Sequence, residues 1–324
     1  MTIKIRTLLP LVLIMGLANG PAGAACDLGF QRLRPVNWRP GHSHTYDPFD
    51  PEQRVQNETL TVRHRGEACR YFVTFSQGRA NSYERAMFRR GESLEYNLYR
   101  NATLDTPLKD RPEAQSNEVL QGRFGSERDG WRRGRGRKRG RRIQRLDYFM
   151  SIAPLQIVSP GVYRDTVRVR LYEGTPSHPV RRDERTLTVT TLVQAAVQVS
   201  IGETGAAFDP RRTQEKLDFG ELEKGEKAYA DLMVRANTGY YIIISSRNRG
   251  RLRHDRRRRN TVGYRFEFDG TRINLRRRRV WLRFAAGGTA LGSSRHPMAV
   301  TIGDVANAPA GPYSDTMTFT VRAR

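Results

Sequence analysis

The chain has 324 residues, enough for two domains of ordinary size, each with its own hydrophobic core. It carries 57 Lys and Arg against 33 Asp and Glu, a formal net charge of +24, and hydrophobic residues make up 37% of it. Together with the 29 Gly, this hydrophobic content excludes gross disorder. Nearly all the basic residues are Arg, which favours planar contacts with phosphate, sulfate or carboxylate, although a coding bias toward Arg gives the same excess.

Residues 1–25 have the pattern of an export signal. A positively charged start precedes an apolar run from Leu8 to Leu17, which is too short to span a bilayer, and small residues follow. We therefore expect a signal peptide that ends at residue 25 and a protein that is exported. A lipoprotein is the alternative, because Cys26 follows the small residues, but the residue at position 23 is Gly rather than the aliphatic residue of a lipobox.

The two cysteines are Cys26 and Cys69. In an oxidising compartment they most simply pair, and closing a loop of this length contributes about 4 kcal/mol in the chain-entropy view. Two free thiols would need a reducing location, against which the export signal argues. The absence of a C-x-x-C motif argues against redox catalysis and a cysteine zinc site. His42 and His44 have loose metal-ligand spacing but are better explained as surface or turn residues.

Alternating apolar and polar residues indicate strands in the first half of the chain. They occur at 60–62, 71–75 and 94–99, and turn residues at 77–78 and 90–91 separate them. This turn spacing is typical of an antiparallel sandwich, and no long amphipathic helix is evident. The fold class is therefore all-β.

A basic, glycine-containing run occupies residues 123–145. It has few apolar residues, so we expect a mobile surface loop. Basic loops with an aromatic residue bind phosphate-rich or carboxylated polymers, and a solvated loop in an Arg-biased chain is the alternative. The candidate polyanion-binding residues are Trp131, Arg132, Arg133, Arg135, Arg137, Lys138, Arg139, Arg141 and Arg142.

The pattern Gly-x-Tyr-x-Asp-Thr occurs at 161–166 and again at 311–316, and alternating apolar residues follow each copy. The chain is therefore a tandem of two related β modules. The first copy is followed by a further strand at 186–193, whereas none follows the second. We predict that Leu187, Val189 and Leu192 complete the first module. The groove left in the second is predicted to be bordered by Tyr313, Met317, Phe319 and Val321.

These features predict a signal peptide at 1–25, a first domain at 26–193 that contains the basic loop, and a second domain at 194–324. Strands are expected in the second domain at 195–201, 230–235, 240–245 and 262–268. Two runs of four arginines, at 256–259 and 276–279, fall between strands.

The sequence resembles the spore coat protein U family, secreted β domains that include subunits of archaic chaperone-usher pili. The matching features are Cys26, Cys69, Leu94 to Tyr99, the two Gly-x-Tyr-x-Asp-Thr motifs, Leu217 to Gly220 and Ala236 to Tyr240. The resemblance implies two immunoglobulin-like, pilin-like β-sandwiches, of which the second is incomplete and accepts a strand from a neighbouring subunit. The basic insertions and the lack of a cysteine pair in the second domain depart from the family pattern.

The resemblance also implies a secreted structural or adhesive pilus subunit. Its partners would be a periplasmic chaperone, an outer-membrane usher and a neighbouring pilin subunit, and its location a fimbrium on the cell surface. A mature chain that starts at Cys26 is tethered at once and has no strand to donate, so we predict the two-domain tip adhesin. The alternative is a secreted basic protein outside any pilus that binds extracellular DNA, lipopolysaccharide or acidic polysaccharide, with no specific nucleic-acid sequence.

Enzyme motifs are absent from the sequence: it has no G-x-S-x-G, no H-E-x-x-H and no P-loop. Asp165 and Asp315 repeat with the modules, and we expect each to cap or turn its own strand rather than to form a catalytic pair. We predict no enzymatic activity, no cofactor and no metal.

Overall fold

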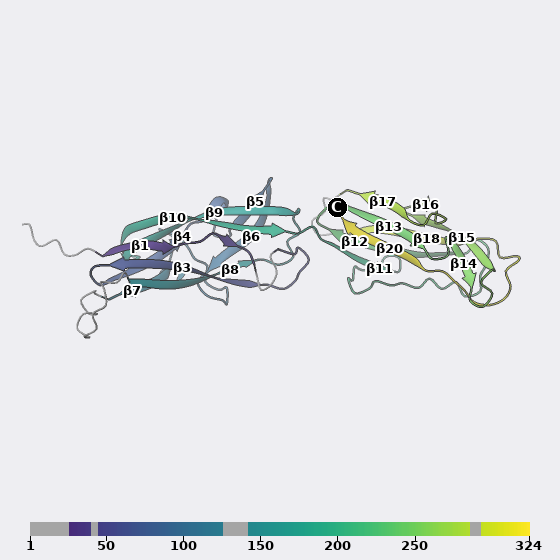
Figure 1. Cartoon of the computed structure of the whole chain (residues 1–324), viewed down its shortest axis with the longest axis horizontal. Coiled ribbons are helices and arrows are strands. Elements are labelled where there is room, and N and C mark those ends of the chain that lie inside the picture. Colours follow the sequence, from purple (N-terminus) through teal and green to yellow (C-terminus); the bar gives the residue numbers. More distant parts are fainter. Residues whose placement is uncertain (1–25, 40–44, 126–141, 286–292) are drawn as a thin grey trace, which may run out of the picture.

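The computed structural model describes residues 26–39, 45–125, 142–285 and 293–324. Its regular structure is almost all β (Figure 1), with two short 3-10 helices in the described part, η1 (Gly78–Ala80) and η2 (Ser116–Glu118). Two separate hydrophobic cores form, one from residues between Cys26 and Val193 and one from residues between Val197 and Val321. We call these groups module 1 and module 2. No helix of the described residues is long and apolar enough to cross a membrane.

Module 1 is a sandwich of two curled, hydrogen-bonded layers. One layer has the order β1-β3-β8-β6 and the other β7-β4-β9-β10-β2, with β5 joining β6 to β9. All neighbouring strands are antiparallel except β10 and β2. The strands are β1 (Asp27–Arg32), β2 (Val36–Asn37), β3 (Val55–Arg65), β4 (Cys69–Phe75), β5 (Ala86–Arg89), β6 (Glu92–Tyr99), β7 (Leu120–Phe124), β8 (Arg142–Ile152), β9 (Gly161–Thr175) and β10 (His178–Val193).

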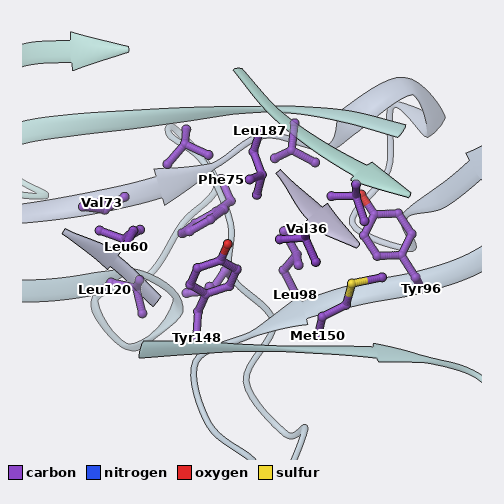
Figure 2. Packing of buried hydrophobic residues seen from close by; sticks show 14 of the residues in the cluster. Val36, Leu60, Val73, Phe75, Tyr96, Leu98, Leu120, Tyr148, Met150 and Leu187 are labelled. Atoms are coloured by element: carbon purple, nitrogen blue, oxygen red, sulfur yellow. The ribbon is translucent and has the colours of Figure 1, made fainter. Parts of the chain in front are cut away.

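The core of module 1 lies between these layers because each strand turns alternate apolar side chains inward. Figure 2 shows Leu60 and Tyr148 from one layer meeting Phe75 and Leu187 from the other. Full burial of a side chain of this size contributes about 1.5–3 kcal/mol. The predicted disulfide between Cys26 and Cys69 is confirmed, and it ties the start of β1 to the start of β4.

Module 2 repeats this architecture with one layer ordered β11-β12-β18-β15-β14-β19, β16 beside β15, and a second layer ordered β17-β13-β20. Its strands are β11 (Val197–Gly202), β12 (Lys227–Ala236), β13 (Tyr240–Ser246), β14 (Arg251–His254), β15 (Thr261–Phe268), β16 (Thr271–Ile273), β17 (Val280–Phe284), β18 (Ser294–Ile302), β19 (Tyr313–Ser314) and β20 (Met317–Ala323).

The strand pairings show which elements of the two modules correspond. Tyr96 faces Ile152 as Tyr264 faces Ile302, so β6 matches β15 and β8 matches β18. Likewise β4 faces β9 through the pair Phe75 and Val169, as β13 faces β20 through Ile244 and Phe319. The offset of 150 residues found in the sequence is thus kept in the pairing of β8 with β18 and of β9 with β20.

The basic run at 123–145 was expected to be a loop throughout, but both of its ends are strands. Its ends belong to β7 and β8, because Phe124 is buried against Tyr71 and His64 and holds β7 on the sheet. Residues 126–141, with all the candidate polyanion-binding residues except Arg142, lie outside the described residues. Arg142 is the first residue of β8, and its guanidinium donates to the carbonyl of Gly125.

Candidate functional site

In module 1 the strand β10 lies between two neighbours. It pairs antiparallel with β9 along its whole length, and its other edge meets β2, where Val189 faces Val36 in a parallel pair. The N–H of Trp38 continues this edge by donating to the carbonyl of Thr190 at 2.9 Å. The free edge of β9 is therefore covered by the chain itself.

The inward side chains of β10 fill the core of module 1. Leu187 is 1% exposed and Val189 is fully buried, whereas Leu192 is 44% exposed and faces outward. Because a strand alternates with period two, the inward positions after Val189 are those of Thr191 and Val193, which are 4% and 1% exposed. Val193 therefore takes the place that the sequence had suggested for Leu192.

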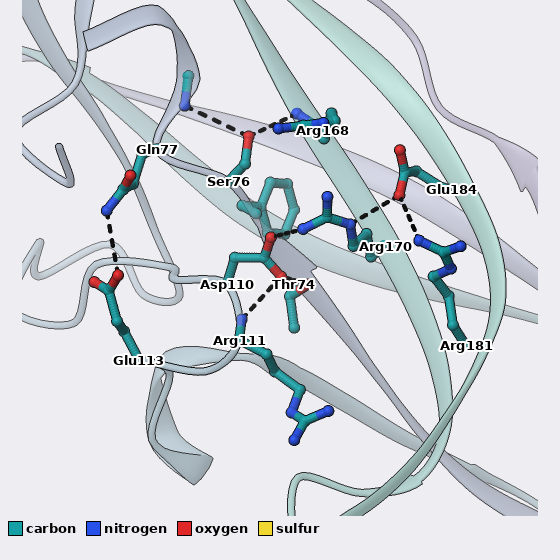
Figure 3. Close-up of polar contacts among 12 residues, drawn as sticks. Thr74, Ser76, Gln77, Asp110, Arg111, Glu113, Arg168, Arg170, Arg181 and Glu184 are labelled. Carbon is teal, nitrogen blue, oxygen red and sulfur yellow. Dashed lines mark hydrogen bonds and ion pairs between the residues drawn. The ribbon is translucent and has the colours of Figure 1, made fainter. Parts of the chain in front are cut away.

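An ion-pair network holds β10 on its outer face (Figure 3). Arg170 of β9 pairs with Asp110 and, at 2.8 Å, with Glu184 of β10. Asp110 is buried and also accepts a hydrogen bond of 2.7 Å from the hydroxyl of Thr74. The hydrogen bond from Arg170 is the main cause that lowers the pKa of Glu184, so the network keeps that carboxylate charged.

Module 2 has counterparts of both neighbours of β10, namely β9 and the segment that contains β2. We call these two counterparts the walls. β20 stands where β9 stands, and Leu217 and Phe219 pack against the core of module 2 as Val36 and Trp38 pack against that of module 1. Within the described residues β20 pairs only with β13, so its other edge has no strand. A groove of about 920 Å³ runs between β20 and residues 215–222.

Apolar side chains from the opposite layer line the floor of this groove. They include Phe266, Met298 and Val300, and the ring of Phe319 lies 6.0 Å from that of Phe266. Sequence analysis missed these floor residues, although their alternation along β15 and β18 is the signal that could have found them. These floor side chains are themselves buried, whereas the apolar side chains along the sides of the groove are partly exposed, which favours a partner that covers them: Leu217, Phe219, Met317 and Phe319.

The predicted groove residues lie along this groove with one exception. Tyr313, Met317 and Phe319 line it, whereas Val321 packs on the core beyond its end. Met317, Phe319 and Val321 are all partly exposed, although their counterparts in β9 are fully buried. Because no strand of the described residues covers the second edge of β20, its apolar side chains are partly exposed to solvent.

Polar contacts fix the end of the groove near β19. The hydroxyl of Tyr313 donates to the carbonyl of Pro309 at 2.9 Å, as Tyr163 does to Ser159 in module 1. Asp315 accepts a 2.7 Å hydrogen bond from Tyr264, and burial together with this bond raises the pKa of Tyr264. Tyr264 is therefore a neutral donor beside the groove.

The described residues bring together one group of side chains with the spacing of metal ligands, Cys26, His64 and Cys69. The two sulfurs are bonded to each other, so neither is a free thiolate ligand. His42 and His44 lie outside the described residues.

The groove is chemically suited to bind an extended apolar peptide.

The two modules are joined through the side chain of Asn237, which is 7% exposed. Its amide nitrogen donates to the carbonyls of Gln194 and Val158, at 2.8 and 3.1 Å, and its amide oxygen accepts from the N–H of Ala196 at 2.9 Å. One residue of module 2 therefore holds the linker and a loop of module 1 together.

Comparison with known proteins identifies a domain in the first part of the chain. Residues 23–170 match the family model of the Spore Coat Protein U domain, so the chain carries a domain of this family there. This confirms the resemblance for that part of the chain. The search of curated proteins found no match.

Solved structures of pilus subunits are similar to this chain in fold. One chain in the crystal structure of the CsuC-CsuE chaperone-tip adhesion subunit complex, from archaic Csu pili of Acinetobacter baumannii, is 12% identical. The match covers 82% of this chain and 91% of that chain, with a TM-score of 0.43. The CupB6 tip adhesin of Pseudomonas aeruginosa is 10% identical over 92% and 94%, with a TM-score of 0.37. Such low identities and TM-scores carry no function over to this chain.

Proposed function

We propose that this protein is a subunit of a chaperone-usher pilus and that a strand from another chain completes module 2. One observation carries the proposal. Both walls that hold β10 in module 1 are present in module 2, while the described residues supply no strand between them. An exposed strand edge beside an apolar groove favours strand addition.

Module 1 indicates what this strand looks like. In β10, Val189, Thr191 and Val193 face Asp165, Tyr163 and Gly161 of β9, and the same three residue types recur at Asp315, Tyr313 and Gly311. The incoming strand would therefore run antiparallel to β20 and place alternate small or apolar side chains on the floor of the groove. Its polar side chains would face solvent.

An uncovered groove is an aggregation hazard, so the subunit needs a partner from export onward. We propose that a periplasmic chaperone covers it first, that an outer-membrane usher receives the complex, and that a neighbouring pilin subunit then supplies the permanent strand. The Spore Coat Protein U domain supports this assignment. The protein would pass through the periplasm and reside in a fimbrium at the cell surface.

We further propose the tip position, with module 1 outermost. β1 begins at Asp27, directly after Cys26, and it pairs with β3 along its length. If export removes residues 1–25, the start of the mature chain is fixed by the disulfide and the sheet. Such a subunit would accept a strand without donating one.

The strand proposal is tested by giving module 2 its own β10. Arg324 corresponds to Gly174 in the 150-residue offset, so a copy of residues 175–193 appended directly after Arg324 continues the chain as β9 continues into β10. We expect a soluble monomer whose module 2 unfolds at a clearly higher temperature than in the unextended chain. In the matched control, the copies of Leu187, Val189 and Val193 are replaced by Ser. Equal melting temperatures for the two extended chains would overturn the proposal.

A further inference from the structure

Twelve exposed arginines lie in β14 and in three turns of module 2, and together we call these segments the basic turns. The turns join β13 to β14, β14 to β15 and β16 to β17, and Figure 1 places β14 and β15 at the end away from module 1. The first turn contacts β15, because the carbonyl of Gly250 accepts a hydrogen bond from the N–H of Tyr264. It also contacts the third turn, because Gly250 lies close to Leu275. The arginines are Arg247, Arg249, Arg251, Arg253, Arg256, Arg257, Arg258, Arg259, Arg276, Arg277, Arg278 and Arg279.

These guanidinium groups form no ion pair with a carboxylate of the described residues. Elsewhere in the same chain arginines do, as in the pairs of Arg54 with Asp50, Arg182 with Glu173 and Arg295 with Asp231. So many unpaired like charges close together repel one another and destabilise the fold. They favour a partner that brings negative charge.

Coding bias does not explain this charge, because module 1 has a neutral counterpart. The stretch 77–118, which corresponds to 246–280 by strand pairing, contains seven basic and seven acidic residues. The stretch 246–280 contains fourteen arginines and three acidic residues. A bias toward Arg codons acts on both stretches alike, so the excess belongs to this end of module 2.

The basic turns lie where the completing strand would leave the groove. In module 1 the chain leaves β10 at Gln194. The side-chain amide of Asn237 donates to the carbonyl of Gln194 and also to that of Val158, so these two residues lie close together. Ser159, the residue after Val158, donates hydrogen bonds to Glu92 at the end of the turn between β5 and β6. The matching turn in module 2 is the longer one that holds residues 256–259.

We infer that the chain that completes module 2 carries acidic residues directly after its donated strand and that the basic turns bind them. This rests on the proposed strand addition. A protein segment is favoured over a free polyanion because the equivalent end of module 1 is already occupied by protein, the start of module 2. Arg forms bidentate hydrogen bonds with carboxylates, so a short acidic segment would meet several donors at once.

The inference is tested with synthetic peptides that copy Arg185–Val193 of β10, added to the full-length protein. One peptide continues with Gly-Ser and four Glu, a second with Gly-Ser and four Gln, and a third has the four Glu before the copy instead. We expect the first to bind about tenfold more tightly than the other two at low salt, with the difference falling as salt screens it. The third has the same charge but places it at the far end of the groove.

Two variants with equal charge separate the basic turns from the general charge of the protein. Replacement of Arg256, Arg257, Arg258 and Arg259 by Ser should abolish the advantage of the first peptide. Replacement of the exposed Arg65, Arg70, Arg123 and Arg145 of module 1 by Ser should leave it. The inference is overturned if the first and second peptides bind alike, or if heparin binding alone depends on the basic turns, which would indicate a polyanion site. Failure of the Gln-tailed peptide to bind would instead contradict the strand addition.

Discussion

The hydroxyl of Tyr264 donates to Asp315 at 2.7 Å, and the hydroxyl of Tyr96 makes the same 2.7 Å bond to Asp165 in module 1. Burial, and then the nearby carboxylate, raises the pKa of both tyrosines, which keeps them protonated donors. The pair joins the two layers at equivalent points of the two modules. It differs in burial, since Asp165 is fully buried and Asp315 is partly exposed beside the open groove.

The other carboxylate oxygen of each aspartate holds the turn after the neighbouring strand. Asp165 accepts the N–H of Arg79 and Asp315 that of Asn248, each at 2.9 Å. The expectation that these aspartates act within their own strands was therefore incomplete. A pattern read along one strand does not show which turn lies beside it.

Replacing Tyr96 with Phe should destabilise module 1 by about 1–3 kcal/mol, because Asp165 would lose a donor in a fully buried position. Replacing Tyr264 with Phe should cost less, about 1 kcal/mol, since Asp315 is partly hydrated and keeps the hydroxyl of Ser246. Urea unfolding of the full chain measures both. Tyr229, which is 56% exposed, supplies the control Tyr229→Phe; equal losses for all three variants would contradict the difference in burial.

Sequence patterns predicted the all-β class and the repeat because period-two alternation and a repeated motif are local signals. They also located β4, β6, β13 and β15 to within a few residues. The return of alternation was placed at Ile152, but β8 begins at Arg142 and ends at Ile152. Alternation does not mark the first part of this strand, because its apolar residue Ile143 faces solvent and the polar residue Gln144 takes a less exposed position.

The groove was only partly predictable. Its β20 wall follows from the repeat, whereas its second wall at Leu217 and Phe219 has no strand pairing to reveal it. The floor comes from β15 and β18, which are distant in sequence and meet β20 only in the folded module. The orientation of Leu192 was not predictable for a similar reason, because both Leu192 and Val193 are apolar and only the register on β9 decides which faces inward.

Replacing both Cys26 and Cys69 with Ser should lower the free energy of unfolding of module 1 by about 4 kcal/mol, because the disulfide closes a loop between residues 43 positions apart. Module 2 should be unaffected, since no cysteine lies in it. Thermal unfolding under oxidising conditions measures the effect. Adding reductant to the wild-type protein should give the same loss, and a variant as stable as the wild type would rule out a stabilising role.

Glu92 should make the stability of module 1 depend on pH. Burial alone would raise its pKa, but hydrogen bonds from Ser159 and Tyr163 outweigh burial and lower it below the ordinary 4.5. A carboxyl group with a lowered pKa stabilises the fold above its ordinary value, and this contribution is lost as pH falls through the folded pKa. Glu92→Gln should therefore lower the melting temperature at pH 7, and the difference should shrink as pH falls below 4.5. The exposed Glu95→Gln is the control, and a difference that persists at low pH would refute the assignment.

Asn237 should determine how rigidly the two modules are joined. Replacing it with Ala leaves the carbonyls of Gln194 and Val158 and the N–H of Ala196 without this partner, at a cost of about 1–3 kcal/mol. Replacing it with Asp keeps the acceptor but removes both donors, so it should loosen the joint nearly as much. Small-angle X-ray scattering should show a broader range of overall dimensions for both variants.

The matched control for the joint is Asn248→Ala, because the side-chain amide of Asn248 also donates to a backbone carbonyl, that of Ser314, but within module 2. This variant should keep the scattering profile of the wild type. If Asn237→Ala did so too, the hydrogen bonds of Asn237 would not set the joint. If only Asn237→Ala and Asn237→Asp broaden it, the two donated hydrogen bonds hold module 2 against module 1, and the module that bears the groove is then fixed relative to the first.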